Sequence, residues 1–248
     1  MCATYPRVAA IQWSPPLQLR LSRHVREPTV PVLQLPSLPA ANSKHFAAKQ
    51  EWGNLPGAAL SLAIAEAATA AKRFTLLLTA DSQSADRLEQ ELGFFAPELS
   101  VLPFPDWETL PYDQFSPHQD IISQRIASLY RLPELSHGVL VVPITTALHR
   151  LAPTRFLLGT SLVLDVGQKL NVEQMRTRLE STGYRCVDTV YEHGEFTVRG
   201  ALIDLFPMGS ELPYRIDLFD DEIETLRTFD AETQRSIDKV ESIRLLPA

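Results

Sequence analysis

The stretch EFTVRGALIDLFPMGSELPYRIDLFDDEIETLRTF, residues 195–229, decides the second half of the fold. Apolar and polar residues alternate along 195–206, 214–219 and 222–229, which is typical of strands with one face in a core. Glycine, serine and aspartate residues separate these segments and favour turns. The pattern therefore predicts consecutive strands joined by short turns, and hence an antiparallel sheet.

The residues on either side of this stretch extend the same module. Asn171 is predicted to cap a helix over 172–183. Two more short strands are predicted at 185–191 and 237–246. Together these elements predict a smaller α+β antiparallel module that covers residues 153–248.

A different architecture is predicted for residues 33–152. Apolar runs at 74–79, 99–102 and 138–142 lack the alternation of a half-exposed strand, so these strands are expected to be covered on both faces. An alanine-rich helix is predicted before the first run, and further helices between the runs. Strands that alternate with helices predict an α/β domain with a parallel sheet.

The composition bounds the compartment and the partners. Residues 1–32 are rich in proline and arginine and lack the apolar segment of a secretory signal, so they are predicted to be a disordered N-terminal arm. The two cysteines, Cys2 and Cys186, favour a reducing, cytoplasmic location. A formal net charge of −7 argues against a general grip on nucleic acid. No apolar run is long enough to span a membrane.

No residue pattern predicts a catalytic, cofactor-binding or metal site. A nucleotide-binding α/β domain needs a glycine-rich loop with a lysine and a hydroxyl residue before its first helix. Residues 53–59, GNLPGAA, take that place and contain neither. The pair Asp220–Asp221 resembles the end of a Walker B strand, but without the lysine loop it is expected to form a hairpin turn. The histidines show no metal-binding spacing, and Trp107 is expected to be a packing anchor.

One face of the predicted module presents residues of the kinds found at protein interfaces. If Ile216 and Leu218 are buried, Arg215 and Phe219 lie on the opposite face of their strand, and the same alternation places Arg199 opposite its own core. Arginine and aromatic side chains are enriched at binding hot spots. The pattern alone leaves two readings open: an interface, or a second core that contains Phe219 together with arginines that serve solubility.

Three stretches resemble the transcription-repair coupling factor (Mfd) family. They are DWETLPYD and FSPH within residues 106–118, GEF and RGA within 194–201, and DLFPMGSELPYR at 204–215. The resemblance implies a region similar to the damage-recognition protein UvrB. Residues 33–152 would be a degenerate P-loop, helicase-like domain (UvrB domain 1a-like), and residues 153–248 an inserted UvrA-interaction module (UvrB domain 2-like).

The resemblance also implies a partner. The family's smaller module is implied to bind UvrA of nucleotide excision repair, and the contact residues that carry over are Arg199, Arg215 and Phe219. Truncating any of the three to alanine is expected to weaken UvrA binding and spare the fold. Leu202, by contrast, is expected to be buried. Contacts with DNA and with RNA polymerase, and ATP-driven translocation, are implied to reside beyond residue 248.

Two departures from the UvrB pattern limit the expected function. The lysine loop is absent, and the connection over 102–120 is too short for the aromatic hairpin with which UvrB clamps DNA, so damage verification is not expected. More of the first domain is expected beyond residue 248, so the first sheet is expected to lack a strand or two. The alternatives are a DNA-binding or ATP-using helicase fragment, and a structural region that autoinhibits the full-length translocase.

Overall fold

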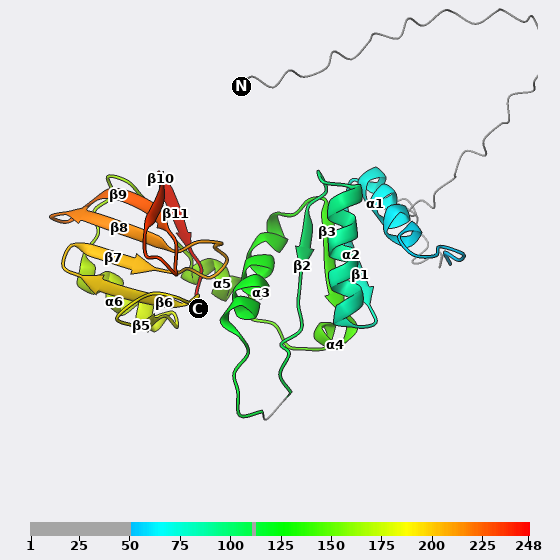
Figure 1. Ribbon diagram of the computed structural model, residues 1–248, viewed down its shortest axis with the longest axis horizontal. Coiled ribbons are helices and arrows are strands. Elements are labelled where there is room, and N and C mark those ends of the chain that lie inside the picture. Colours follow the sequence, from blue (N-terminus) through cyan, green and yellow to red (C-terminus); the bar gives the residue numbers. More distant parts are fainter. Residues whose placement is uncertain (1–50, 111–112) are drawn as a thin grey trace, which may run out of the picture. The chain divides into compact units, whose positions relative to one another are not determined.

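The structure, a computed structural model, describes residues 51–110 and 113–248 (Figure 1). The predicted N-terminal arm, residues 1–32, lies outside the described residues, as does the start of the predicted α/β domain. Along the described chain, a three-stranded sheet is followed by a six-stranded sheet, and a two-stranded ribbon accompanies the second.

The first sheet is parallel, and its strands lie in the order β1-β3-β2. The strands are β1 (Phe74–Thr79), β2 (Val101–Pro103) and β3 (Gly138–Pro143). Each of the three apolar runs forms a strand, so the predicted parallel α/β architecture is confirmed. The central strand, β3, is buried along its whole length, as a run without alternation predicts.

Helices flank these strands, and side chains cap the starts of some of them. They are α1 (Ala59–Ala71), α2 (Ser82–Phe95), α3 (Gln119–Arg131) with the 3-10 turn η1 (Leu132–Glu134), α4 (Ile144–Ala147) and α5 (Thr154–Thr160). The Asp81 carboxylate accepts a hydrogen bond of 2.7 Å from the backbone N–H of Ser84 at the start of α2. This bond lowers the pKa of Asp81 below its usual value.

The two faces of the first sheet are covered unequally. Helices α1 and α2 pack on one face against Val139 and Val141, while α3 contributes Leu129 to a cluster on the other face. On that second face, Leu76 and Leu78 of the edge strand β1 are 53% and 49% exposed. The prediction that this strand is covered on both faces is therefore wrong for the described residues, because only its α1–α2 face packs into a core.

The second sheet is mixed and largely antiparallel. Its strands are β5 (Arg185–Cys186), β6 (Glu195–Arg199), β7 (Leu202–Leu205), β8 (Tyr214–Phe219), β9 (Glu222–Phe229) and β10 (Ser236–Val240). They lie in the order β10-β9-β8-β7-β6-β5, and all neighbours are antiparallel except β5 and β6. The predicted strands 214–219 and 222–229 have the observed bounds.

One face of this sheet forms the core of the module. It packs against α6 (Val172–Ser181) and against the ribbon of β4 (Leu162–Asp165) and β11 (Ser242–Leu245). The fully buried side chains at its centre include Phe196, Ile203 and Ile216. Asn171 caps α6 as predicted, since its side chain accepts a hydrogen bond of 2.9 Å from the Gln174 N–H.

Three predicted strands differ from the observed ones. The strand predicted at 195–206 is a hairpin, because Gly200 adopts a positive φ of 64° and starts a turn. Only two residues of the strand predicted at 185–191 join the sheet. The strand predicted at 237–246 divides at Glu241, and its second part leaves the sheet to pair with β4, a strand that the sequence analysis missed.

Candidate protein-interaction face

The face of the six-stranded sheet opposite the core consists of cross-strand rows of mostly polar residues. One row contains Thr197, Asp204, Arg215 and Arg227, and the next contains Arg199, Leu202, Asp217 and Thr225. Residues two apart in a strand share a face, so Phe219 lies on the same side as Asp217. We refer to the surface formed by Arg199, Asp204, Arg215, Asp217 and Phe219 as the arginine face.

A buried carboxylate lies at the centre of the arginine face. Asp204 is 0% exposed, and the Arg215 guanidinium binds it with both edges of its fork. Arg215 donates from Nε to Oδ1 at 2.7 Å and from Nη2 to Oδ2 at 3.0 Å. Arg199 donates from Nη2 to the same Oδ2. One carboxylate thus holds two guanidinium groups from neighbouring strands.

Arg215 is more covered than the sequence analysis expected. Besides Asp204, its Nη1 donates to the Gln234 carbonyl oxygen at 3.3 Å, and its guanidinium lies 4.8 Å from the centre of the Phe229 ring. Only 16% of its side-chain surface is exposed. The hydrogen bonds to Asp204 raise the pKa of Arg215 above its usual value. Arg215 lies on the predicted face, but most of its guanidinium is already committed within the chain.

Arg199 and Phe219 are the accessible residues of the predicted set. Half of the Arg199 side-chain surface, 51%, is exposed, so its guanidinium has room for a second anion beside Asp204. Phe219 is 69% exposed. Both positions follow from the alternation, because Ile216, Leu218 and Phe196 are buried as predicted.

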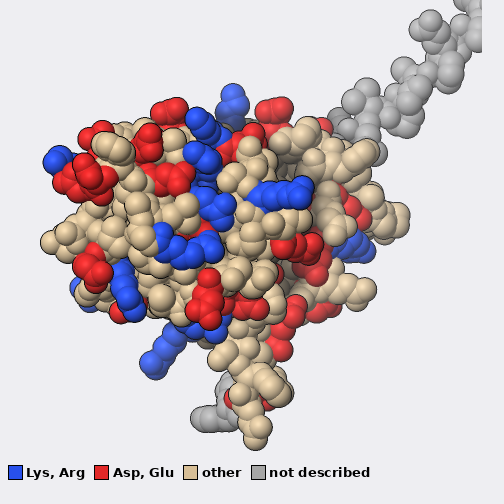
Figure 2. All heavy atoms as spheres, turned by 60° about the vertical axis from the view of Figure 1, so that its left-hand side comes forward, with Lys and Arg blue, Asp and Glu red and all other residues tan. Residues whose placement is uncertain are grey.

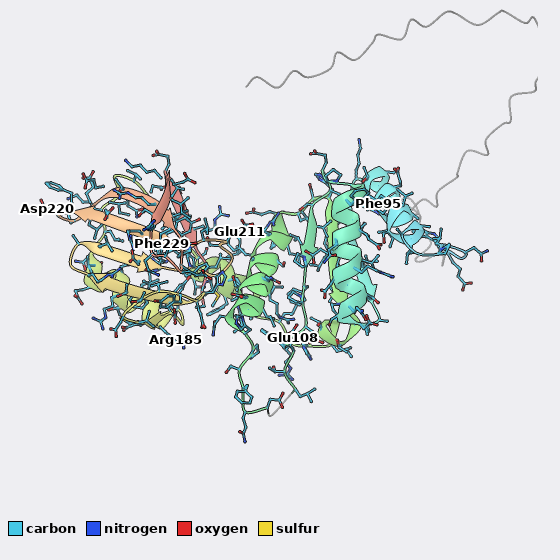
Figure 3. The ribbon with its side chains drawn as sticks, viewed as in Figure 1. Phe95, Glu108, Arg185, Glu211, Asp220 and Phe229 are labelled. Carbon is cyan, nitrogen blue, oxygen red and sulfur yellow. The ribbon has the colours of Figure 1, made fainter. Side chains whose placement is uncertain are left out.

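Phe219 lies at the end of a tight hairpin. Its neighbour Asp220 occupies the tip of the β8–β9 hairpin (Figure 3) and adopts a positive φ of 54°, so the predicted turn at Asp220–Asp221 is confirmed. Phe219 pairs with Glu222 across this turn. The turn thus holds a large aromatic ring on an ordered strand end rather than in a loop.

A second apolar cluster exists on this side of the sheet, but Phe219 is not part of it. The buried members are Val190, Phe206 and Phe229, at the opposite end of the strands. His193 stacks on Phe206, with ring centres 3.9 Å apart. The reading in which Phe219 belongs to a second core is therefore wrong.

Leu202 was expected in the core, and the structure places it elsewhere. It is only partly buried, and its pairing with Arg199 and Asp217 puts it on the arginine face. The cause is the turn at Gly200, because it reverses which residues of the second strand point inward. Ile203, the next residue, is the one that is fully buried.

The charges around this face are mixed. Asp217 accepts a hydrogen bond of 2.9 Å from Thr225 and lies 3.3 Å from Arg227. On the face of the molecule that Figure 2 displays, basic and acidic side chains both occur. Such a mixture favours a protein partner over a nucleic acid, because a phosphate backbone binds best to an uninterrupted basic surface.

Another arginine, Arg125, packs between two aromatic side chains. Trp107 packs against the guanidinium of Arg125, which lies 3.9 Å from its ring centre and 4.1 Å from that of Phe104. Burial lowers the pKa of Arg125 to about 10. This confirms Trp107 as a packing anchor, although nothing in the sequence marked Arg125 as its partner.

Nucleotide, metal and membrane sites would each need a different feature of the chain. The loop over residues 53–59 leads directly into α1, and its Pro56 carbonyl oxygen accepts the Ala59 N–H at 3.2 Å. Within residues 51–110 and 113–248, no group of three histidine, cysteine or carboxylate side chains could hold a metal ion. In the same ranges, no helix is both long enough and apolar enough to cross a membrane.

Comparisons with known proteins agree on one family. Residues 162–248 match the UvrB interaction domain. The chain is 53% identical to the transcription-repair-coupling factor of Escherichia coli (strain K12) over 196 residues, which is 79% of the chain. The chain belongs to the transcription-repair coupling factor family. Identity to the factors of Haemophilus influenzae (strain ATCC 51907 / DSM 11121 / KW20 / Rd) and Staphylococcus aureus (strain USA300) is 48% and 36%.

The match also bounds what this region can represent. The chain spans only 17% of the length of each of these coupling factors. The matched interaction domain begins at the first residue of β4, and it contains the core of the six-stranded sheet and all of the arginine face. The candidate site therefore lies inside the region that matches the UvrB interaction domain.

Proposed function

We propose that this chain recruits UvrA to transcription-blocking DNA damage for nucleotide excision repair, by protein-protein contact and without ATPase activity of its own. The observation that carries the proposal is the exposure of Phe219 and Arg199 on the same open face of the sheet, within the region that matches an interaction domain. Both side chains are accessible, and both belong to residue types that dominate binding energy.

Three residues have different roles in the proposed contact. Phe219 supplies apolar area that the chain itself does not cover, and it is held at a strand end, so little ordering is needed on binding. Arg199 supplies a guanidinium for a carboxylate of UvrA. Arg215 supports the same surface, with a small exposed edge available to the partner.

The proposed domain division follows the two sheets. Residues 33–152 would form the degenerate helicase-like domain and residues 153–248 the UvrA-interaction module. The parallel sheet with flanking helices supports the first assignment, and the match to the UvrB interaction domain supports the second. The loop at 53–59 supports the absence of nucleotide binding, since it carries no lysine to reach a phosphate.

The experiment that tests the proposal is titration of purified UvrA with the 248-residue chain in a calorimeter. We expect a saturable protein-protein interaction that Phe219→Ala weakens. No heat of binding between UvrA and the parent chain, at concentrations up to tens of micromolar, would contradict the proposal.

The same instrument tests the alternative of a DNA-binding or ATP-using fragment. We expect no saturable binding of ATP in the presence of magnesium and only weak binding of duplex DNA at physiological salt, because the loop at 53–59 lacks a lysine and the net charge is −7. Saturable, magnesium-dependent ATP binding or sub-micromolar affinity for damaged DNA would favour the alternative.

A further inference from the structure

The arginine face has a buried centre that the proposed contact alone does not require. Contact residues need to be accessible, yet Asp204 is 0% exposed. Placing a carboxylate out of water is costly unless cations and hydrogen bonds satisfy it. Among the described residues, the Asp204 side chain is paired with Arg215 and Arg199, from the strands on either side of its own. Its position therefore ties the accessible arginine to the covered one.

The two arginines are held to different degrees. All three guanidinium nitrogens of Arg215 have partners, since Nε and Nη2 bind Asp204 and Nη1 binds the Gln234 carbonyl oxygen. Its ring contact with Phe229 adds a further constraint. Arg199 shares Oδ2 of the same carboxylate through Nη2, while half of its side-chain surface stays in solvent. Arg215 thus fixes Asp204, and Asp204 in turn fixes one edge of Arg199.

We propose that Asp204 is a positioning residue, whose carboxylate holds the Arg199 guanidinium so that its outer edge meets a carboxylate of the partner. This inference rests on the proposed function. Two guanidinium groups around one carboxylate leave a net charge of about +1, so the group that fits is an anion. The planar fork of arginine matches a carboxylate in two parallel hydrogen bonds.

The advantage of such an arrangement is entropic. A free arginine side chain loses rotamer freedom when a partner fixes it, and this loss of entropy reduces affinity. Asp204 imposes that order before the partner arrives. A carboxylate at the surface would do this poorly, because water would compete for the guanidinium.

The first test needs no partner. Nitrogen-15 NMR of arginine side chains in the 248-residue chain reports whether each guanidinium rotates freely about its Nε–Cζ bond. We expect separate Nη signals for Arg199 and Arg215 in the parent chain, and averaged Arg199 signals in Asp204→Asn. Glu180→Gln is the matched control, because it removes a carboxylate that binds another arginine, Arg176, on helix α6, which packs on the core face of the sheet. Averaged Arg199 signals in the parent chain would overturn the proposal.

The second test measures coupling in UvrA binding. We expect Asp204→Asn to weaken binding about tenfold and the double variant with Arg199→Ala to bind no more than about twofold more weakly than Arg199→Ala alone. The control Glu180→Gln should stay within about twofold of the parent. A purely structural role would instead lower affinity equally in both backgrounds, and that result would overturn the positioning role.

Thermal unfolding of each variant shows whether it is folded, and if Asp204→Asn is not, the NMR of the parent chain decides. The outcomes also separate the two proposals. A parent chain that binds UvrA regardless of Asp204→Asn contradicts the positioning role alone. A parent chain that does not bind UvrA contradicts the proposed function, while the NMR still reports on Arg199.

Discussion

Each of the two sheets leaves one face partly open, and the two open faces display different chemistry. On the first sheet, Leu76 and Leu78 of β1 are half exposed beside a cavity of about 200 Å³ lined by apolar side chains such as Leu129 and Leu140. On the second sheet, the open face carries arginines paired to a buried aspartate, with one exposed phenylalanine. The open face of the first sheet is apolar, whereas that of the second sheet is charged.

The chemistry of an open face helps to distinguish an incompletely covered core from a binding surface. An apolar strand face is compatible with any apolar cover and offers little discrimination. A face with fixed charges rejects partners that cannot pair those charges, so it gives specificity. We therefore propose the arginine face, rather than the exposed side of β1, as the surface that recognises the partner.

The largest expected effect separates the two sides of a single strand. Ile203→Ala should lower the free energy of unfolding by about 2–5 kcal/mol, because it opens a cavity in the core of the module. Leu202→Ala, one residue earlier on the arginine face, should cost less than about 1 kcal/mol. Urea unfolding followed by circular dichroism measures both. Equal losses would show that the strand faces are misassigned.

A smaller effect separates the two arginines. Arg215→Ala should lower the free energy of unfolding by about 2 kcal/mol or more, because it leaves buried Asp204 without its bidentate partner. Arg199→Ala should cost less than about 1 kcal/mol, since its side chain is half exposed. The same unfolding experiment compares them. This revises the expectation that every truncation on the face spares the fold, and an Arg215 variant as stable as the parent would restore it.

Local patterns predicted much of the module. Strands β8 and β9 have the predicted bounds because alternation and the Asp220–Asp221 turn are encoded within a few residues. The hairpin at Gly200 was missed because both of its strands alternate. The turn changes only whether the odd-numbered or the even-numbered residues face the core. That change moved Leu202 from the core to the arginine face.

Non-local pairing set the limit of prediction. β4 pairs with β11 across some eighty residues of chain, and no local pattern marks a partner that distant. The arginine face was predicted, but Asp204 was not. Asp204 binds arginines from the two strands beside its own, and one of these, Arg215, also donates to the Gln234 carbonyl oxygen. Alternation predicts which face of a strand a residue lies on. It does not predict how far segments distant in the sequence cover that residue.

The smallest expected effect concerns salt. Raising the salt concentration from about 50 to 300 mM should weaken UvrA binding of the parent chain by about threefold, because Arg199 is half exposed and its charge is screened. The Arg199→Ala variant should lose much of this dependence, whereas Phe219→Ala should keep it. Titration calorimetry at the two salt concentrations compares them. Equal salt dependence in all three chains would remove Arg199 from the contact.

The most direct test of the assignment compares the two open faces in one binding measurement. Phe219→Ala and Leu76→Ala each shorten an exposed apolar side chain, one on the arginine face and one on β1. Titrated against UvrA, with thermal unfolding as a check on folding, Phe219→Ala should lose roughly 2 kcal/mol, about thirtyfold in affinity, and Leu76→Ala should bind like the parent. If Leu76→Ala loses affinity while Phe219→Ala keeps it, the arginine face is not the UvrA-binding surface.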